Sequence, residues 1–302
     1  MAETAPETRC GFIAVIGAPN AGKSTLVNAL VGSKVSIVSR KVQTTRVPIR
    51  GIAIEGTTQL VLIDTPGIFA PRRRLDRAMV AAAWGGAGDA DVVVLLVDAA
   101  KATDEDVDRI FDGLKGSKAS LVLALNKIDR VKKEELLGLS EKLNARMPFA
   151  GTLMISALHG YGIADVRAYL ARTVPPGPWH YPEDEISDTP MRLLAAEITR
   201  EKIYERLHDE LPYAATVETT DWREQKGAVR IEQTIYVARD SQKSIVLGSG
   251  GRTIKQLSME SRKELGEILE KPVHLFLFVK VRADWEDDPE RYRELGLTFP
   301  KD

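Results

Sequence analysis

The chain has 302 residues, of which 44% are hydrophobic and 28% charged, and its formal net charge is −1. This length favours two domains, and the composition is that of a globular protein rather than a disordered or fibrous one. The longest apolar runs fall far short of the roughly 20 residues that span a bilayer, so we expect no transmembrane anchor. The lone Cys10 excludes an internal disulfide framework and fits a reducing cytoplasm.

The first predicted feature is a short disordered tail, residues 1–9, which carries acids and a proline and lacks the apolar core of a secretion signal. From Phe12 to about Val174, apolar runs typical of strands alternate with helical stretches, one of which begins at Lys23. The runs are FIAVIG, QLVLIDT, ADVVVLLVD, SLVLALN and TLMIS. This alternation predicts an α/β domain over residues 10–176, with a mostly parallel sheet and helices on both faces.

A second domain is expected after a linker at residues 177–190, where proline and acidic residues follow no helical or strand period. Helical spacing in MRLLAAEITREKIYERL comes next, and AATVETTDW and AVRIEQTIYVA predict a hairpin with a turn at Gln225 to Gly227. A β-rich segment leading into a glycine loop, a helix and the strand PVHLFLFVKV complete an α+β domain, residues 191–302, with a C-terminal extension.

The first motif with chemical meaning is GAPNAGKS, which has the G-x-x-x-x-G-K-S spacing between a predicted strand and a predicted helix. Its glycines let backbone amides wrap phosphates, and the helix N-terminus adds a favourable dipole. Lys23 is expected to reach the outer phosphates and Ser24 to bind magnesium. The expected phosphate-binding residues are Gly17, Ala18, Pro19, Asn20, Ala21, Gly22, Lys23, Ser24 and Thr25.

Two later segments select the base. In NKID, the carboxylate of Asp129 can accept two hydrogen bonds from guanine N1 and N2, which adenine does not present. In SAL, the backbone amide of Ala157 can reach the guanine oxygen. Each segment alone is ordinary loop chemistry, but both follow strands at the end of the sheet where ligands bind, so together they predict GTP or GDP. The expected base-binding residues are Asn126, Lys127, Asp129, Ser156, Ala157 and Leu158.

Two segments are expected to sense the end phosphate. DTPG places Asp64 near magnesium, through water, and presents the Gly67 amide to the phosphate. VQTTR, between the first helix and the next strand, supplies a threonine that meets magnesium only while that phosphate is present. We choose Thr45, with Thr44 as the alternative. The predicted catalytic set is Lys23, Thr45, Asp64 and Gly67.

These segments together resemble the translation-factor-like GTPases, and GAPNAGKSTLVNAL, SRKVQTTR and DTPGI in one chain are similar to the Era family of bacterial ribosome-assembly GTPases. With ELPYAATVE, VLGSGGRTIK and PVHLFLFVKV, the second domain resembles the type II K-homology domain of that family. The resemblance implies a cytoplasmic monomer that hydrolyses GTP with magnesium. It also implies binding to the 3′ end of 16S ribosomal RNA during assembly of the small (30S) subunit.

Ile68 follows DTPG, where many GTPases have a glutamine that orients water, so we expect slow turnover and an apolar side chain turned away from the phosphate. Charge stabilisation matters most in phosphoryl transfer. In related GTPases with this replacement, an asparagine at the position of Asn20 helps hold potassium. Our hypothesis is that K⁺ at Asn20 and the backbone near Thr44 assists catalysis; the alternative is that Asn20 only stabilises its turn. The run Arg72 to Arg74 is interpreted as solvated surface.

The loop GSGG, Gly248 to Gly251, is a G-x-x-G that grips the backbone of unpaired nucleotides when it precedes a basic helix in a K-homology fold. Many family members have a lysine inside this loop, whereas Ser249 and Gly250 carry no charge. The nearby apolar side chains of Ile245, Leu247, Ile254 and Leu257 are interpreted first as ordinary core, with a groove that accepts bases as the alternative. The expected RNA-binding residues are Ile245, Leu247, Gly248, Ser249, Gly250, Gly251, Arg252, Ile254, Lys255 and Arg262.

Three other classes of protein share parts of this pattern. A P-loop nucleotide kinase is disfavoured by NKID and SAL, and a nucleotide-independent RNA-binding protein by the intact Lys23 and Ser24. A membrane-recruited GTPase that regulates cell division or growth would keep the GTPase and place RNA binding second. Because the second domain has no dense basic cluster, peripheral contact with the inner face of the membrane is the secondary interpretation.

Overall fold

The computed structural model describes residues 7–283 and 285–300, and the chain divides into two compact units. The first unit comprises Met1–Ser36, Thr45–Asp188 and Gly296–Asp302; the second comprises Ile37–Thr44 and Thr189–Leu295. Most of the predicted tail lies outside the described residues, and its last residue, Arg9, already opens the first strand.

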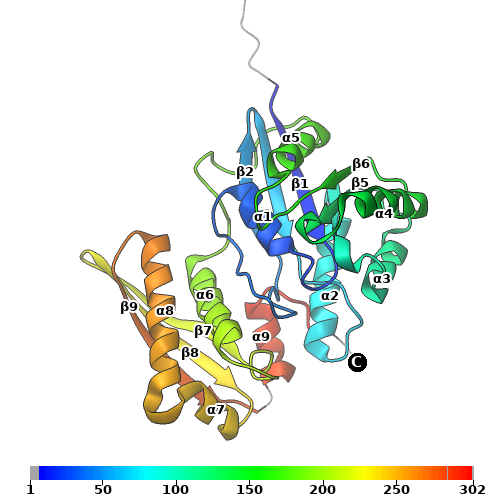
Figure 1. The fold of residues 1–302 in the computed structure, drawn as a ribbon. Coiled ribbons are helices and arrows are strands. Elements are labelled where there is room, and N and C mark those ends of the chain that lie inside the picture. Colours follow the sequence, from blue (N-terminus) through cyan, green and yellow to red (C-terminus); the bar gives the residue numbers. More distant parts are fainter. Residues whose placement is uncertain (1–6, 284, 301–302) are drawn as a thin grey trace, which may run out of the picture. The chain divides into compact units, whose positions relative to one another are not determined.

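The first unit is built on a six-stranded sheet in the order β2-β3-β1-β4-β5-β6 (Figure 1). All neighbours pair in parallel except β2, which is antiparallel to β3. The mostly parallel sheet is therefore confirmed, although the strand IRGIAIE, now β2, was absent from the predicted runs. The strands are β1 (Arg9–Ile16), β2 (Ile49–Glu55), β3 (Thr58–Asp64), β4 (Val92–Asp98), β5 (Ser120–Asn126) and β6 (Gly151–Met154).

Helices cover both faces of this sheet because its central strands are apolar on both sides. Ile13 and Val15 of β1 share one core cluster with α1 and α5, whereas Ala14 and Ile16 share another with α2, α3 and α4. Every residue of β4 is buried. The helices are α1 (Lys23–Val31), α2 (Arg74–Gly88), α3 (Glu105–Leu114), α4 (Lys133–Arg146) and α5 (Ile163–Thr173), with short 3₁₀ turns at Ala99–Lys101 and Ile128–Arg130.

The segment predicted as a linker is fixed against β2 and β3 of the first unit. The Gln59 side chain accepts a hydrogen bond from the Tyr181 backbone N at 3.1 Å, and Arg50 pairs with Asp188 at 2.9 Å. The boundary between the units falls after Asp188, inside the predicted linker, so residues 177–188 belong to the first unit.

The second unit has the order α-β-β-α-α-β-α and a three-stranded sheet, β7-β8-β9, in which β7 and β8 are antiparallel and β8 and β9 parallel. Its core lies between one face of the sheet and helices α6 and α8. The elements are α6 (Met191–Arg206), β7 (Thr216–Gln225), β8 (Ala228–Val237), α7 (Asp240–Leu247), a 3₁₀ turn (Ser249–Gly251), α8 (Arg252–Leu269), β9 (Val273–Val281), a 3₁₀ turn (Trp285–Asp287) and α9 (Pro289–Glu294).

The prediction of a β-rich segment before the glycine loop is wrong, because this segment forms helix α7. The Gln242 side chain accepts hydrogen bonds from the backbone N of Ala238 and Arg239 at 2.9 and 3.2 Å, which satisfies donors at the start of the helix. The apolar run of Ile245 to Leu247 misled because so short a run does not distinguish a helix from a strand. Among the described residues, no helix is both long and apolar enough to cross a membrane.

Candidate nucleotide and RNA sites

The P-loop runs from the end of β1 to the start of α1 and holds its lysine in place. Lys23 is 6% exposed, and its Nζ donates to the carbonyls of Gly17 and Ala18 at 3.2 and 3.0 Å. Burial lowers the pKa of Lys23 to about 8, while the nearby Asp64 carboxylate opposes this shift. A bound phosphate would supply further negative charge to this ammonium group and favour its protonated form.

A cluster of three oxygen-bearing side chains lies beside the lysine. Ser24 Oγ donates to Asp64 Oδ2 at 2.7 Å and lies 2.9 Å from Thr45 Oγ1, which is itself 3.3 Å from Asp64 Oδ2. Asp64 is fully buried, which raises its pKa, and its Oδ1 has no hydrogen-bond partner among the described residues. Hydroxyl and carboxylate oxygens are the ligands that Mg²⁺ prefers, so these residues fit that ion.

The structure also separates the two candidate threonines. Thr45 contributes its hydroxyl to the cluster, whereas the hydroxyl of Thr44 donates to the backbone oxygen of Lys41 at 2.9 Å. Thr45 is therefore the residue that the fold brings to Ser24 and Asp64.

The DTPG segment approaches the P-loop closely. A Cβ on Gly67 would lie 3.0 Å from Pro19 Cα, so only glycine fits here without displacing backbone. The next residue, Ile68, donates its backbone N–H to the Gly17 carbonyl at 3.1 Å and is 1% exposed in the core with Ala14. The Ile68 side chain therefore packs into the core, and its orientation relative to a bound phosphate stays a prediction.

Asn126, predicted from the sequence to bind the base, joins two loops of the site in the described structure. Its Nδ2 donates to the Ala21 carbonyl at 2.7 Å, and its Oδ1 accepts from the Ala157 backbone N at 3.0 Å. Asn126 is 2% exposed. It therefore braces the P-loop against the SAL loop.

Asp129 remains available to a base. It is partly exposed, accepts a hydrogen bond from Ser156 Oγ and lies 3.9 Å from His159. The Ser156 hydrogen bond is the main reason that the pKa of Asp129 is lowered, which keeps it an ionised acceptor for guanine donors. Leu158 is 73% exposed beside it, open to contact.

The sequence reading missed Asp98, which ends β4. Its Oδ2 pairs with Lys127 Nζ at 2.6 Å, and Lys127 also donates to the Asn20 carbonyl at 2.6 Å. The signal was present, because Asp98 ends a parallel strand at the sheet edge that carries the rest of the site. The arginine run is engaged elsewhere: Arg73 pairs with Asp76, and Arg74 lies over the Phe299 ring.

The GSGG loop joins α7 to α8 in a conformation that depends on glycine. Gly248, Gly250 and Gly251 have φ of 73°, 62° and 75°, the left-handed region that other residues rarely adopt. Arg252 Nε donates back to the Ser249 carbonyl at 3.2 Å and closes the loop. Three backbone positions are thus set by glycine immediately before a helix N-terminus.

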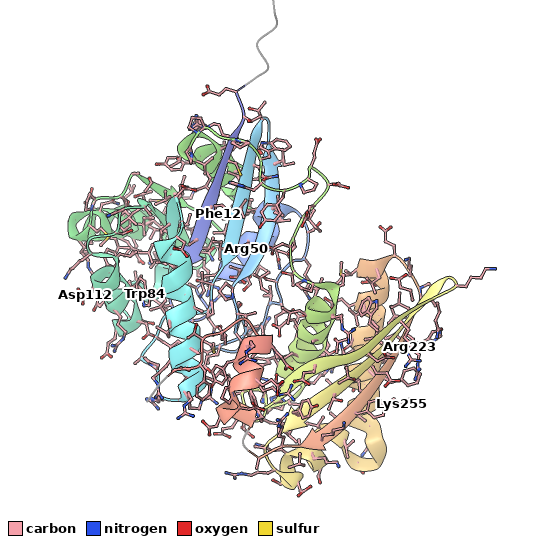
Figure 2. All side chains as sticks on the ribbon, turned by 180° about the vertical axis from the view of Figure 1, so that it is seen from behind. Phe12, Arg50, Trp84, Asp112, Arg223 and Lys255 are labelled. Carbon is pink, nitrogen blue, oxygen red and sulfur yellow. The ribbon has the colours of Figure 1, made fainter. Side chains whose placement is uncertain are left out.

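One stripe of α8 presents positive charge. Arg252, Lys255, Met259 and Arg262 are exposed and spaced so that they share one face of the helix. Figure 2 labels Lys255 among them. Within the described part of the chain, Lys255 and Arg262 make no hydrogen bond or ion pair. Of the candidate groove residues, Ile245 is 55% exposed, Leu247 and Ile254 are half-buried, and Leu257 is core.

Comparisons with known proteins agree with a nucleotide site in the first unit and an RNA site in the second. A family model described as 50S ribosome-binding GTPase matches residues 12–127, and one described as KH domain matches residues 210–286. The GTPase Era of Bradyrhizobium sp. strain BTAi1 is 64% identical over 297 residues, covering 98% of this chain and 96% of that protein. The chain belongs to the Era family.

Two solved Era structures share the whole fold. One is Era in complex with MgGDPNP and nucleotides 1506–1542 of 16S ribosomal RNA, and the other is an Aquifex aeolicus Era variant bound to GDP and AlF₄⁻. Each has a TM-score of 0.91 and 34% identity, covering 96% of this chain and 99% of the other. As an Era-family member, the chain is a GTPase that converts GTP to GDP and phosphate and uses Mg²⁺.

Proposed function

We propose that the chain is a GTP-hydrolysing switch that binds single-stranded RNA at the 3′ end of 16S ribosomal RNA and acts in assembly and maturation of the 30S subunit. The observation that carries the RNA half is the glycine loop at the start of α8, followed by Lys255 and Arg262, which are exposed and have no partner among the described residues. Such a loop approaches a nucleic-acid backbone closely, and unpaired cations bind phosphates. The Era complex with a 16S segment supports the same target.

In the GTPase half, we assign binding to the residues predicted from the P-loop, DTPG, NKID and SAL segments. Lys23 holds the outer phosphates with its ammonium group, and the Gly67 amide faces the end phosphate. Ser24 and Thr45 are assigned to Mg²⁺ directly and Asp64 through water; when bound, the ion neutralises charge on the phosphates. Because Ile68 is buried and apolar, no side chain at that position orients water, and slow intrinsic turnover follows.

Potassium is proposed as an additional cofactor at Asn20. This residue is exposed in the P-loop with φ of 60°, and its amide side chain carries an oxygen of the kind that binds alkali cations. The test compares GTP turnover in potassium and sodium buffers of equal ionic strength, with Asn20→Ala alongside. We expect faster turnover in potassium for the parent and no difference for the variant. Equal rates for the parent would reject the idea.

The RNA site is tested by removing the unpaired cations. Lys255→Gln and Arg262→Gln should each weaken binding of an RNA copied from nucleotides 1506–1542 and reduce the slope of log affinity against log salt by about one. Lys271→Gln is the matched control, because Lys271 is exposed in the same unit and paired with Glu224 at 3.4 Å. If all three variants bind alike, the RNA lies elsewhere.

We further propose that residues 10–176 form the GTPase domain and 191–302 the RNA-binding domain, in a cytoplasmic monomer. Peripheral contact with the inner face of the cell membrane is a secondary proposal, which the same exposed cations of α8 would serve. Sedimentation on anionic vesicles, with and without competing RNA, tests it. Because the same cations would bind both, excess RNA should displace the protein from the vesicles; vesicle binding that persists in excess RNA would contradict a shared surface on α8.

A further inference from the structure

The segment between α1 and β2 is divided between the two units. Ile37–Thr44 belongs to the second unit, whereas the chain from Thr45 onward belongs to the first. Ile37 is 3% exposed and lies in a core cluster with Leu194 and Ile198 of α6. The peptide bond after Thr44 therefore joins a segment packed on α6 to the threonine that meets the predicted magnesium ligands.

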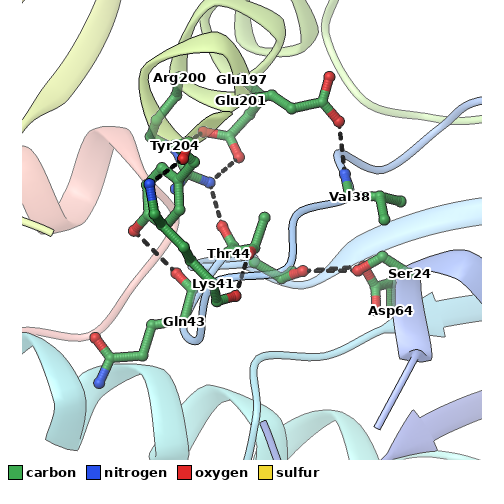
Figure 3. Close-up of polar contacts among 11 residues, drawn as sticks. Ser24, Val38, Lys41, Gln43, Thr44, Asp64, Glu197, Arg200, Glu201 and Tyr204 are labelled. Atoms are coloured by element: carbon green, nitrogen blue, oxygen red, sulfur yellow. Dashed lines mark hydrogen bonds and ion pairs between the residues drawn. The ribbon is translucent and has the colours of Figure 1, made fainter. Parts of the chain in front are cut away.

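Helix α6 holds the end of this segment by its main chain (Figure 3). The Tyr204 hydroxyl donates to the Gln43 carbonyl at 3.2 Å, and Arg200 Nη2 donates to the Thr44 carbonyl. Both contacts fix backbone immediately before Thr45. Gln43 has φ of 57°, a left-handed conformation that a non-glycine residue keeps only when its surroundings hold it there.

Two further contacts anchor the start and the middle of the segment. The Val38 backbone N donates to Glu201 Oε1 at 2.7 Å. Lys41 Nζ donates to the carbonyls of Tyr204 and Leu207, at the C-terminal end of α6, where the helix dipole favours a cation. The segment is thus attached to α6 along its whole length.

Arg200 makes this attachment costly to break. It is 1% exposed and paired with Glu197, and its Nη1 is buried without a hydrogen-bond partner among the described residues. Nη2 donates one of its two N–H groups to Thr44 and the other to Glu197, so loss of the Thr44 carbonyl would leave a further N–H group unsatisfied in the same buried place. The contacts with α6 therefore hold the segment Ile37–Thr44 in one defined conformation.

The same helix contacts the RNA-binding helix on another side. Lys202 Nζ pairs with Glu264 at 2.7 Å, and Arg206 Nε donates to Glu260 at 3.0 Å. Glu260 and Glu264 lie on α8, which begins at the GSGG loop. One helix thus contacts both the segment before Thr45 and the helix that carries the unpaired cations.

We propose that Arg200 and Tyr204 are positioning residues that present Thr45 to the nucleotide site, and that α6 thereby links the nucleotide state to RNA binding on α8. This inference rests on the proposed GTP-dependent RNA binding. The described state has Thr45 beside Ser24 and Asp64, so contacts that hold the segment favour the GTP-bound form over the GDP-bound form. By linkage, a nucleotide that engages Thr45 stabilises the segment on α6 in return.

The test uses two conservative variants and one matched control in the full chain. Tyr204→Phe removes only the hydroxyl that donates to the Gln43 carbonyl. Arg200→Lys keeps the positive charge but removes the planar guanidinium group that donates to both Glu197 and Thr44. Arg192→Gln is the control: Arg192 is also on α6 and donates to the carbonyls of Thr219 and Thr220, away from the segment. Affinities for GDP and for a non-hydrolysable GTP analogue are measured with magnesium, followed by RNA affinity in each nucleotide state.

Both positioning variants should weaken analogue binding about three- to tenfold, the loss of one hydrogen bond, and leave GDP binding unchanged. The ratio of RNA affinities between the two nucleotide states should shrink toward one. Arg192→Gln should match the parent. Analogue binding in Tyr204→Phe and Arg200→Lys equal to that of Arg192→Gln would overturn the inference. If the parent chain binds no RNA in either nucleotide state, the proposed function is refuted instead. The two failures can be told apart because the nucleotide affinities are measured without RNA.

Discussion

Replacing Asn126 with alanine is expected to destabilise the nucleotide-free protein, because this residue braces two loops rather than contacting the base alone. The change would leave the Ala21 carbonyl and the Ala157 N–H without partners, in residues that are 2% and 5% exposed. Each unsatisfied buried group costs about 1–3 kcal/mol. Water can enter the space that the side chain leaves beside Gly22, so we expect a total of about 2–4 kcal/mol.

Calorimetry of the nucleotide-free protein should show Tm lower by about 4–16 °C, from about 2–4 °C for each kcal/mol in a unit of this size. GDP and IDP, which lacks the guanine amino group, should lose affinity by the same factor. Asn144→Ala is the control. Asn144 Nδ2 also donates two hydrogen bonds, to the Ser140 carbonyl at 2.8 Å and to Thr152 Oγ1 at 2.9 Å, but it lies outside the nucleotide-binding segments. An unchanged Tm with a loss confined to GDP would refute the brace and restore Asn126 to the base.

Three further predictions concern other residues. Asp129→Asn should lower GTP affinity about a hundredfold or more and favour xanthosine nucleotides, because an amide then faces the guanine donors; an unchanged base preference in competition binding would contradict the role of Asp129. Ser249→Lys should strengthen RNA binding and steepen its salt dependence by about one unit, whereas Ser249→Gln should not; equal salt slopes would place the loop away from phosphate. Burial raises the pKa of the Cys10 thiol, so the folded protein should carry less thiolate than free cysteine and react slowly with iodoacetamide at about pH 8.5; rapid alkylation without denaturant would count against this burial.

Much of the site was predictable because its signals are local. The P-loop, DTPG, NKID and SAL segments each combine a fixed spacing with a position at the end of a strand, and the fold brings them to one edge of the sheet. Helix α6 and strand β9 were likewise readable from apolar periodicity. Strand β2 was missed because Arg50 and Gly51 interrupt its apolar run, and α7 because its apolar run is too short to separate helix from strand.

What could not be predicted depends on contacts between residues far apart in the sequence. Nothing local in Ile37–Thr44 shows that it packs with a helix more than a hundred residues later, and the proline-rich segment before Asp188 has no period that reveals its attachment to β3. The brace role of Asn126 depends on where the P-loop and the SAL loop end in space. Tertiary contacts determine these roles, whereas motif spacing determines only which groups are available.

The central claim is that nucleotide state controls RNA binding, and its most direct test is the affinity of the parent chain for labelled RNA of nucleotides 1506–1542 at fixed salt. The measurement is made once with the non-hydrolysable GTP analogue and once with GDP, both with magnesium. Binding at least severalfold tighter with the analogue is the predicted result. Equal binding in both states would contradict the switch, and no binding in either would leave a GTPase whose second unit serves another partner.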